Sequence, residues 1–370
     1  MVQEGGREKD VRTEKFSLLT RALEQVVEGQ PSEARRSLAE LTKRLDVESV
    51  AEDMQYVLFA AALARRLGDG DAQQLNLYLK RFELPQISLF NLLAQRLPLA
   101  SLAGSIANDC LCDLFAGHEE ATLIDVGLGT GRQEVALLRR LKERGVALRR
   151  LTVVGVEPDT DSLHRAETDL TAAARELDLD LRFRGIPRVI EALGADDWRW
   201  LRDGPGPRVV HSAFALHHMA GDLDQRQVLF ERFRELEPTA VVLIEPNSDH
   251  FTNSLAQRFH NAWRHLFFIF GLVDELQLPV QERNAIKRFF GRELEDILGA
   301  VDDSRRFERH ERKETWLERL RRAGFSTARR LEGSWSSPHP AMVVHPEPGH
   351  VGLCYREETV VAVIRATVEG

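Results

Sequence analysis

Hydrophobic residues recur with helical spacing along the first third of the chain, and no alternating strand pattern interrupts them. Two helices are predicted within residues 16–46, with a break near Pro31, because glycine and proline there end one helix and begin the next. The alanine-rich stretch 50–67 predicts a third helix, and helical patterns continue between residues 71 and 115. We therefore expect residues 15–118 to be entirely helical.

At residue 121 the pattern changes to short apolar runs that alternate with amphipathic helices. Strands are predicted over 122–126, 150–156, 181–183, 208–211 and 240–244. The helices between them are predicted over 132–144, 160–177 and 222–236. This alternation predicts an α/β fold with a doubly wound, mostly parallel sheet and right-handed crossovers, and we assign this core to residues 119–247.

Long amphipathic helices interrupt the alternation over residues 248–300. A helix predicted from Asn253 to Leu276 carries four aromatic residues at near-helical spacing, namely Phe259, Trp263, Phe267 and Phe270. Such a stripe is more typical of a core than of a pocket wall, although the helix can also pack on the N-terminal helices as a lid.

Residues 301–370 are expected to complete the core. They contain a helix predicted over 313–323, followed by strand-like stretches at 341–344 and 360–366. We predict that these two strands form a C-terminal antiparallel pair.

One loop joins an acidic strand end to three glycines: Asp125 is followed by Gly127, Gly129 and Gly131. Glycines let the backbone turn tightly and approach a ligand, and free N–H groups at the next helix favour polar or anionic groups. The third glycine comes one position too early for the dinucleotide pattern G-x-G-x-x-G. The pattern D-x-G-x-G-x-G is that of class I S-adenosylmethionine-dependent methyltransferases, which predicts S-adenosylmethionine as the cofactor. The alternative is a tight strand-to-helix turn.

Glu157 closes the second predicted strand, 26 residues after Gly131. An acid at this place can accept hydrogen bonds from both hydroxyls of a ribose. We therefore predict that Glu157 binds the cofactor, the alternatives being a solvated loop acid or an N-cap partner for the helix that follows.

Polar residues also follow the fourth and fifth strands, where ligands bind in open α/β sheets. His217 and His218 are candidates for a general base, since a neutral imidazole can remove a proton near neutral pH. Glu245 is a third catalytic candidate, and Asn247 is a candidate for recognising polar substrate groups. The alternatives are a histidine that caps the turn and an acid that pairs with an arginine. His211 lies inside the fourth strand and is predicted to be a core residue.

Composition narrows the classes of partner. The 370 residues have 43% hydrophobic and 29% charged residues, enough for a sizeable core, and a formal net charge of -8. Phosphate binding needs a basic surface, so nucleic acid is not the expected partner. The mixed-sign stretch Arg305–Lys313 is predicted to be a solvated helix face with ion pairs.

Cys110, Cys112 and Cys354 are the only cysteines, and their spacing completes no zinc motif, so no metal is expected. Residues 1–14 are polar and are predicted to be disordered, without the apolar core of a signal peptide. The most apolar stretch, 266–273, is too short to span a bilayer. We therefore expect a cytoplasmic protein with no membrane partner.

Taken in order, several motifs resemble the GRAS family, whose plant members regulate transcription and whose bacterial members look like methyltransferases. The resemblance covers roughly residues 50–370 and rests on Gly70–Tyr78, Leu123–Val126, Phe214–Met219, Glu237-Pro238, Val242–Asn247, Asn253–Asp274, Arg309–Glu311, Trp316 and Arg322–Phe325.

The resemblance implies a Rossmann-like core under a helical cap, built from residues 15–118 and from an insertion at 248–300. It also implies that homodimers are possible. Plant regulatory members generally have eroded glycine loops, whereas all three loop glycines are present here, which favours an enzyme.

Our leading hypothesis from the sequence is therefore an S-adenosylmethionine-dependent methyltransferase of bacterial GRAS type, acting on an oxygen or nitrogen of a small-molecule substrate. The rival hypothesis is a non-catalytic GRAS-type ligand-binding or regulatory protein interaction module.

Overall fold

The computed structural model describes residues 2–68 and 96–368. The helix expected from residue 71 and the family motif Gly70–Tyr78 lie outside the described residues. The chain divides into two compact units. We call residues 1–97 with 248–309 the helical unit, and residues 98–247 with 310–370 the sheet unit. Both units are therefore built from two separate stretches of the sequence.

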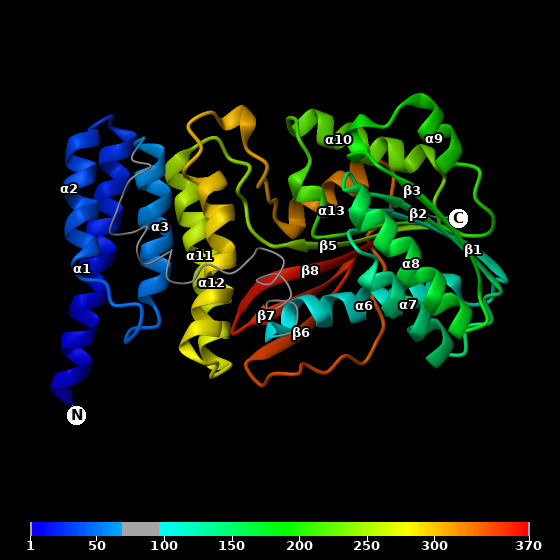
Figure 1. The fold of residues 1–370 in the computed structure, drawn as a ribbon, viewed down its shortest axis with the longest axis horizontal. Coiled ribbons are helices and arrows are strands. Elements are labelled where there is room, and N and C mark those ends of the chain that lie inside the picture. The colour runs from blue at the N-terminus through cyan, green and yellow to red at the C-terminus, as the bar shows by residue number, and fades with distance from the viewer. Residues whose placement is uncertain (1, 69–95, 369–370) are drawn as a thin grey trace. The chain divides into compact units, whose positions relative to one another are not determined.

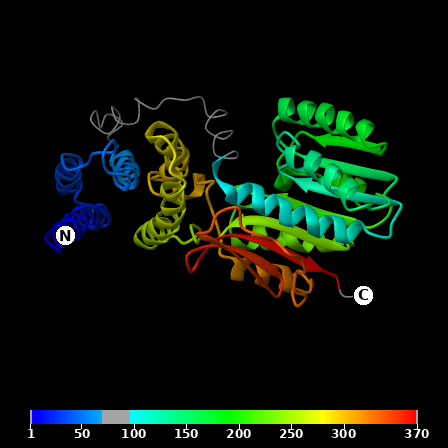
Figure 2. The ribbon, with the colours of Figure 1, turned by 90° about the horizontal axis from the view of Figure 1, so that it is seen from below.

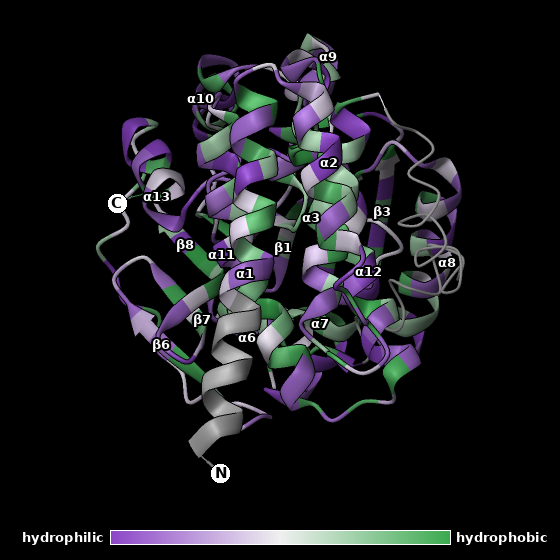
Figure 3. Cartoon of the chain, turned by 90° about the vertical axis from the view of Figure 1, so that its left-hand side faces the viewer, coloured by the Kyte–Doolittle hydropathy of each residue, from purple (hydrophilic) through white to green (hydrophobic). Residues whose placement is uncertain are grey.

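The helical unit is formed by helices from both of its stretches of chain (Figure 1). Its helices in the described residues are α1 (Val2–Val27), α2 (Pro31–Thr42), α3 (Asp53–Arg66), α11 (Leu255–Glu275) and α12 (Val280–Ile297). Helix α1 begins at Val2, where the sequence predicted a disordered segment through residue 14. Hydrophilic and hydrophobic residues alternate around α1 and α2, as amphipathic helices require (Figure 3).

An aromatic cluster joins α1, α3 and α11. The ring of Trp263 lies 5.0 Å from Phe16, 5.0 Å from Tyr56 and 4.9 Å from Phe59. Tilted and edge-on contacts at such distances add to the stabilisation from burial of these large side chains. The aromatic stripe of α11 is therefore mostly core, as predicted, although Phe267 keeps 48% of its surface exposed.

The sheet unit contains eight strands in the described residues: β1 (Glu120–Val126), β2 (Arg150–Val156), β3 (Asp180–Ile186), β4 (Arg208–Ala213), β5 (Ala240–Pro246), β6 (Met342–Glu347), β7 (His350–Tyr355) and β8 (Glu358–Thr367). Their order is β3-β2-β1-β4-β5-β8-β7-β6. The first five strands are parallel, and β8 runs antiparallel to β5. The carboxyl ends of the parallel strands therefore meet at one edge.

Helices cover both faces of this sheet. The helices of the unit are α6 (Pro98–Phe115), α7 (Arg132–Glu143), α8 (Thr160–Glu176), α9 (Ala195–Leu201), α10 (Leu223–Glu235) and α13 (Lys313–Arg322). One face packs on α9, α10 and α13, and their core includes Phe230, Phe233 and Trp316. Helix α6 packs on β5 and β8, α7 lies beside α6, and α8 lies beside α7 (Figure 2).

The α/β class and the mixed sheet confirm the coarse prediction, with two differences in detail. Strand β7 was not predicted, and it separates β6 from β8, so these two do not pair with each other. Its sequence contains His350 and Gly352 and lacks a clear alternation, so the ladders on both sides define it. The sheet unit begins at Pro98, whereas the core was predicted to begin at residue 119, so α6 belongs to the sheet unit.

Candidate functional site at the carboxyl ends of the parallel strands

The glycine loop leads from β1 into α7. Gly127, Gly129 and Gly131 have φ values of +80°, +55° and +70°, a left-handed conformation that other residues rarely adopt. A Cβ atom on Gly127 would lie 2.3 Å from the Cβ of Ala215, and one on Gly131 would lie 3.0 Å from the Cβ of Ala166. Turn geometry and close packing therefore explain why these positions are glycine.

Glu157 follows β2, and its side chain accepts a hydrogen bond from the glycine loop. One carboxylate oxygen accepts the backbone N–H of Gly129 at 3.0 Å, and the other accepts that of Asp159 at 3.0 Å. The sequence prediction paired this acid with a ribose, but both of its oxygens already accept hydrogen bonds from the protein backbone.

Glu245 ends β5, fully buried at the same edge of the sheet. Its Oε2 lies 2.6 Å from Nδ1 of His217, and its Oε1 accepts the backbone N–H of Leu216 at 2.9 Å. The ring of His217 lies 4.0 Å from that of His218 and 4.3 Å from that of His310. The structure thus brings together the three residues predicted to be catalytic.

The electrostatics of this cluster follow from burial. Burial raises the pKa of Glu245 to about 7, while the positive charges of His310, His218 and Arg226 act to lower it. The acid is therefore held near the midpoint of its titration at neutral pH.

Asn247 was predicted to bind a substrate. Its amide nitrogen donates to the carbonyl of Thr359 at 3.0 Å, and its amide oxygen accepts the N–H of Lys313 at 2.8 Å. The side chain therefore connects the end of β5 to β8 and to the start of α13.

A buried ion network beside this cluster was missed by the sequence reasoning. Glu311 accepts from Arg226 at 3.0 Å and from Arg319 at 2.7 Å. Arg226 also lies over the ring of Trp316, 5.1 Å from its centroid, and donates to the carbonyl of His217 at 3.3 Å. The network thus supports the turn that carries His217.

The prediction of a solvated helix face over Arg305–Lys313 is wrong. His310 and Glu311 are buried, and the residues between the short 3-10 turn Asp303–Arg305 and the helix α13 are not helical. A stretch with charges of both signs is easily predicted to be solvated when the residues that pair with it are distant in the sequence. Arg309–Glu311 was identified only as a motif of the family resemblance, and this motif was the one sequence feature that singled out the buried residues.

Beneath the glycine loop lie two further acids. Asp125 and Glu134 are almost completely buried, and burial raises the pKa of each, with Glu134 raising that of Asp125 further. Asp125 is paired in register with His211 on β4.

His211 is a core residue, as predicted, with no exposed surface. Burial lowers its pKa to about 4, so the ring is neutral. Its Nδ1 lies 2.9 Å from the carbonyl oxygen of Val242, which places the ring proton there. Its Nε2 then accepts from the amide nitrogen of Gln133 at 2.7 Å.

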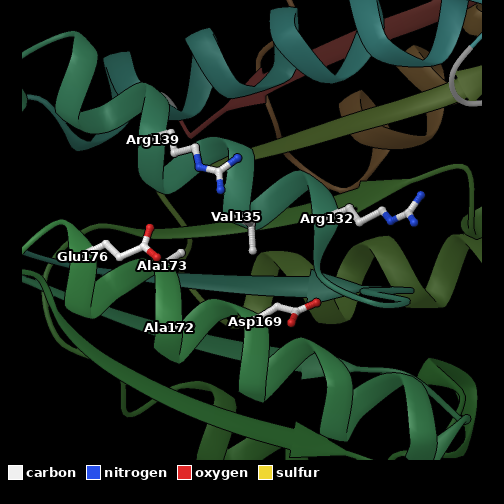
Figure 4. Close-up of a pocket in the computed structure, with 7 residues that line it drawn as sticks. All are labelled: Arg132, Val135, Arg139, Asp169, Ala172, Ala173 and Glu176. Atoms are coloured by element: carbon white, nitrogen blue, oxygen red, sulfur yellow. The ribbon is translucent and has the colours of Figure 1, made fainter.

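A groove of about 390 Å³ lies between α7 and α8 (Figure 4). Val135 from α7 and Ala172 and Ala173 from α8 contribute apolar surface. Charged residues complete its lining, namely Arg132, Arg139, Asp169 and Glu176.

Comparison with known proteins gives one consistent family. The sequence model of the GRAS domain family matches residues 16–334. DELLA protein RGL3 of Arabidopsis thaliana is 26% identical over 270 residues, which are 72% of this chain and 51% of that protein. Protein SLENDER RICE1-LIKE 1 of Oryza sativa subsp. japonica is 30% identical over 62% of this chain and 48% of that protein. The chain thus spans about half the length of these curated relatives.

Among solved structures, the chain is similar to SCL7 of Oryza sativa, with a TM-score of 0.77 and 22% identity. The match covers 95% of this chain and 98% of that one. At this identity the likeness shows the shared fold.

These findings overturn the predicted activity. The matched family is the GRAS domain family, and DELLA protein RGL3 is among the relatives. The family resemblance found in the sequence associates plant GRAS proteins with regulation of transcription. The predictions of a methyltransferase, of S-adenosylmethionine as its cofactor and of a small-molecule substrate are therefore wrong. The three glycines led to the wrong prediction of a cofactor-dependent enzyme. Packing and turn geometry already require glycine at positions 127 and 131, whatever the loop binds. The individual roles assigned to His217, His218, Glu245 and Asn247 stay predictions.

Across residues 2–68 and 96–368, the helices are all too short or too polar to cross a membrane.

Proposed function

We propose that this chain, which belongs to the GRAS domain family, is a non-catalytic regulatory module that acts by binding other proteins. The proposal follows the rival hypothesis from the sequence, a non-catalytic GRAS-type regulatory protein interaction module. A cytoplasmic location and a homodimeric state remain predictions.

The observation that carries the proposal is the internal use of the polar groups at the strand ends. Both oxygens of Glu157 accept backbone N–H groups, and both oxygens of Glu245 contact the turn that carries His217. Both ends of the Asn247 amide are likewise used by the fold. A catalytic acid or base must instead reach a substrate. These groups are better suited to holding the fold.

The α7–α8 groove supplies a surface for a partner (Figure 4). Arg132 and Arg139 are seven residues apart on α7, and Asp169 and Glu176 are seven residues apart on α8. Seven residues make two helical turns, about 10 Å, so each pair forms a row along its helix. The groove therefore has one basic and one acidic wall.

The charges of this groove are available to a partner. Arg132, Arg139 and Glu176 form no ion pair with the described residues, while Asp169 lies 3.9 Å from Arg165 of its own helix. The small side chains of Ala172 and Ala173 permit a close approach. The partner that fits is an amphipathic helix with acidic residues facing α7 and basic residues facing α8, each at heptad spacing.

The test begins with a photo-crosslinking residue in place of Ala172 in the full chain, expressed in its source organism. Proteins crosslinked at this position are identified by mass spectrometry, purified and titrated against the wild type. The groove variant carries Arg132→Glu and Arg139→Glu. The control carries Lys142→Glu on α7 and Arg175→Glu on α8, which make the same total change of charge outside the groove lining.

We expect a partner whose affinity falls at least tenfold in the groove variant and by less than about threefold in the control. A charge-reversed partner helix should restore binding to the groove variant. Equal losses in the two variants would show that general charge, and not this groove, recognises the partner. Failure of every purified candidate to bind the wild type would overturn the proposal.

A further inference from the structure

Two carboxyl groups and one imidazole meet inside the sheet unit, below the glycine loop. Asp125 comes from β1, Glu134 from the first turn of α7 and His211 from β4. Their exposed fractions are 2%, 4% and 0%. One ligand atom of each lies within 4.8 Å of those of the other two. The proposed regulatory function uses none of them.

The imidazole is oriented as a metal ligand requires. The Nδ1–H of His211 points at the carbonyl of Val242, 2.9 Å away, which fixes the tautomer and leaves the Nε2 lone pair as the acceptor for the amide of Gln133. Histidines that bind metals usually donate their other ring N–H to a carbonyl or carboxylate in this way. Gln133 is only half-buried, so its amide can release Nε2.

Among the described residues, no arginine or lysine acts on the pKa of Asp125 or of Glu134. Burial raises the pKa of both acids, and the charge of Glu134 and its hydrogen bond with Asp125 raise the pKa of Asp125 further. Its Oδ2 atom is buried without a hydrogen-bond donor in the described part of the chain. By contrast, Glu311 in the same unit is neutralised by two arginines. A pair of buried carboxyl groups must be neutralised by a bound cation or by a shared proton.

We propose that Asp125, Glu134 and His211 bind one divalent transition-metal ion of the zinc class. Oxygen and imidazole ligands together suit zinc and its neighbours, whereas calcium and magnesium prefer oxygen alone. Two carboxylates balance the charge of the ion. Because the ligands come from β1, α7 and β4, the ion ties the glycine loop to the centre of the sheet and stabilises the fold.

The test measures metal in the full chain with zinc as the only probe. The purified protein is analysed by mass spectrometry for bound metals, stripped with a chelator and titrated with Zn²⁺ by calorimetry. Asp125→Asn and Glu134→Gln keep the size of the side chains and remove a charged ligand. His345→Ala is the control, since it removes an exposed histidine that pairs with Glu347 at 3.1 Å.

We expect one equivalent of zinc in the wild type and in His345→Ala, and an affinity at least tenfold weaker in the two ligand variants. Zinc should raise the Tm of the first two proteins and leave that of the ligand variants unchanged. Circular dichroism establishes that the variants are folded. Cobalt absorption gives a second readout, since the visible bands report nitrogen and oxygen ligands directly.

Two outcomes would overturn the proposal. The first is zinc binding that persists in Asp125→Asn and Glu134→Gln. The second is a wild type that binds no zinc. An Asp125→Asn variant that is then more stable than the wild type would show that a shared proton neutralises the pair. Either result leaves the α7–α8 groove unaffected, because its test measures partner affinity.

Discussion

Among single residues, Glu245 combines complete burial with a position near several basic side chains. Nδ1 of His217 lies 2.6 Å from its Oε2, and His310, His218 and Arg226 act to lower its pKa, but burial still raises that pKa to about 7. The folded protein therefore binds a proton here more tightly than the unfolded chain does. This difference makes the stability of the fold depend on pH.

We predict that Glu245→Gln removes part of this dependence. The unfolded acid ionises near 4.5 and the folded one near 7, so the contribution of Glu245 is fully present below pH 4.5 and is lost as the pH rises to 7. The loss corresponds to roughly 3 kcal/mol. Urea unfolding at several pH values should show a flatter curve for the variant. The control Glu143→Gln, on an exposed acid, should follow the wild type, and parallel curves for Glu245→Gln would contradict the prediction.

Glu311 gives a second prediction at this scale. Its replacement by Gln removes the buried carboxylate that pairs with both Arg226 and Arg319, so the free energy of unfolding should fall by about 3–5 kcal/mol. Asp196→Asn, which breaks an exposed pair with Arg199, should cost less than about 1 kcal/mol. Chemical denaturation measures both variants, and similar losses would argue against a structural network.

At the scale of elements, the loop between β1 and α7 shows how two constraints act on one turn. All three glycines have positive φ, but their surroundings differ. A Cβ at Gly127 would collide with Ala215, whereas nothing lies within 4 Å of a Cβ at Gly129. The first position is limited by conformation and packing, and the second by conformation alone.

Alanine substitution should separate these constraints. We predict that Gly129→Ala costs about 1–2 kcal/mol, the penalty for a left-handed residue. Gly127→Ala should cost at least about 1–3 kcal/mol more, because an overpacked contact is added. Thermal and urea unfolding of the two variants provide the comparison. Equal losses would mean that Ala215 moves away without cost.

For the whole molecule, the main feature is that each compact unit is assembled from two stretches of chain. All eight described strands belong to residues 98–247 and 310–370. The side chain of Asn247 accepts the N–H of Lys313 at 2.8 Å, so the two stretches of the sheet unit lie close together where the helical residues depart. A short linker can therefore join them.

We predict that residues 98–247, joined to 310–370 by a short glycine-serine linker, fold without the helical unit. Unfolding should be cooperative, with a near-ultraviolet dichroism signal from packed aromatic rings. A shorter chain that starts at residue 119, the boundary predicted from the sequence, should fail this test. It lacks α6, whose Ile106, Leu111 and Phe115 are buried. Equal folding of both chains would show that α6 is dispensable.

Local patterns were enough to predict much of this protein. Apolar runs located all five parallel strands, and helical spacing located α2, α3, α7, α8, α10, α11 and α13. Ordered motifs identified the GRAS family, which the match over residues 16–334 confirms. These signals survive in the sequence because periodicity and turn residues are local properties of the backbone.

Only the tertiary structure decided which polar side chains form hydrogen bonds or ion pairs within the protein. The sequence shows an acid at position 157 and another at position 311, but their partners lie 28 and 85 residues away, at Gly129 and Arg226. The strand β7 likewise depends on ladders to strands that flank it in space. The sequence determined the elements and the family, whereas long-range contacts determined that the strand ends hold the fold together, since hydrogen bonds between distant residues leave no periodic trace.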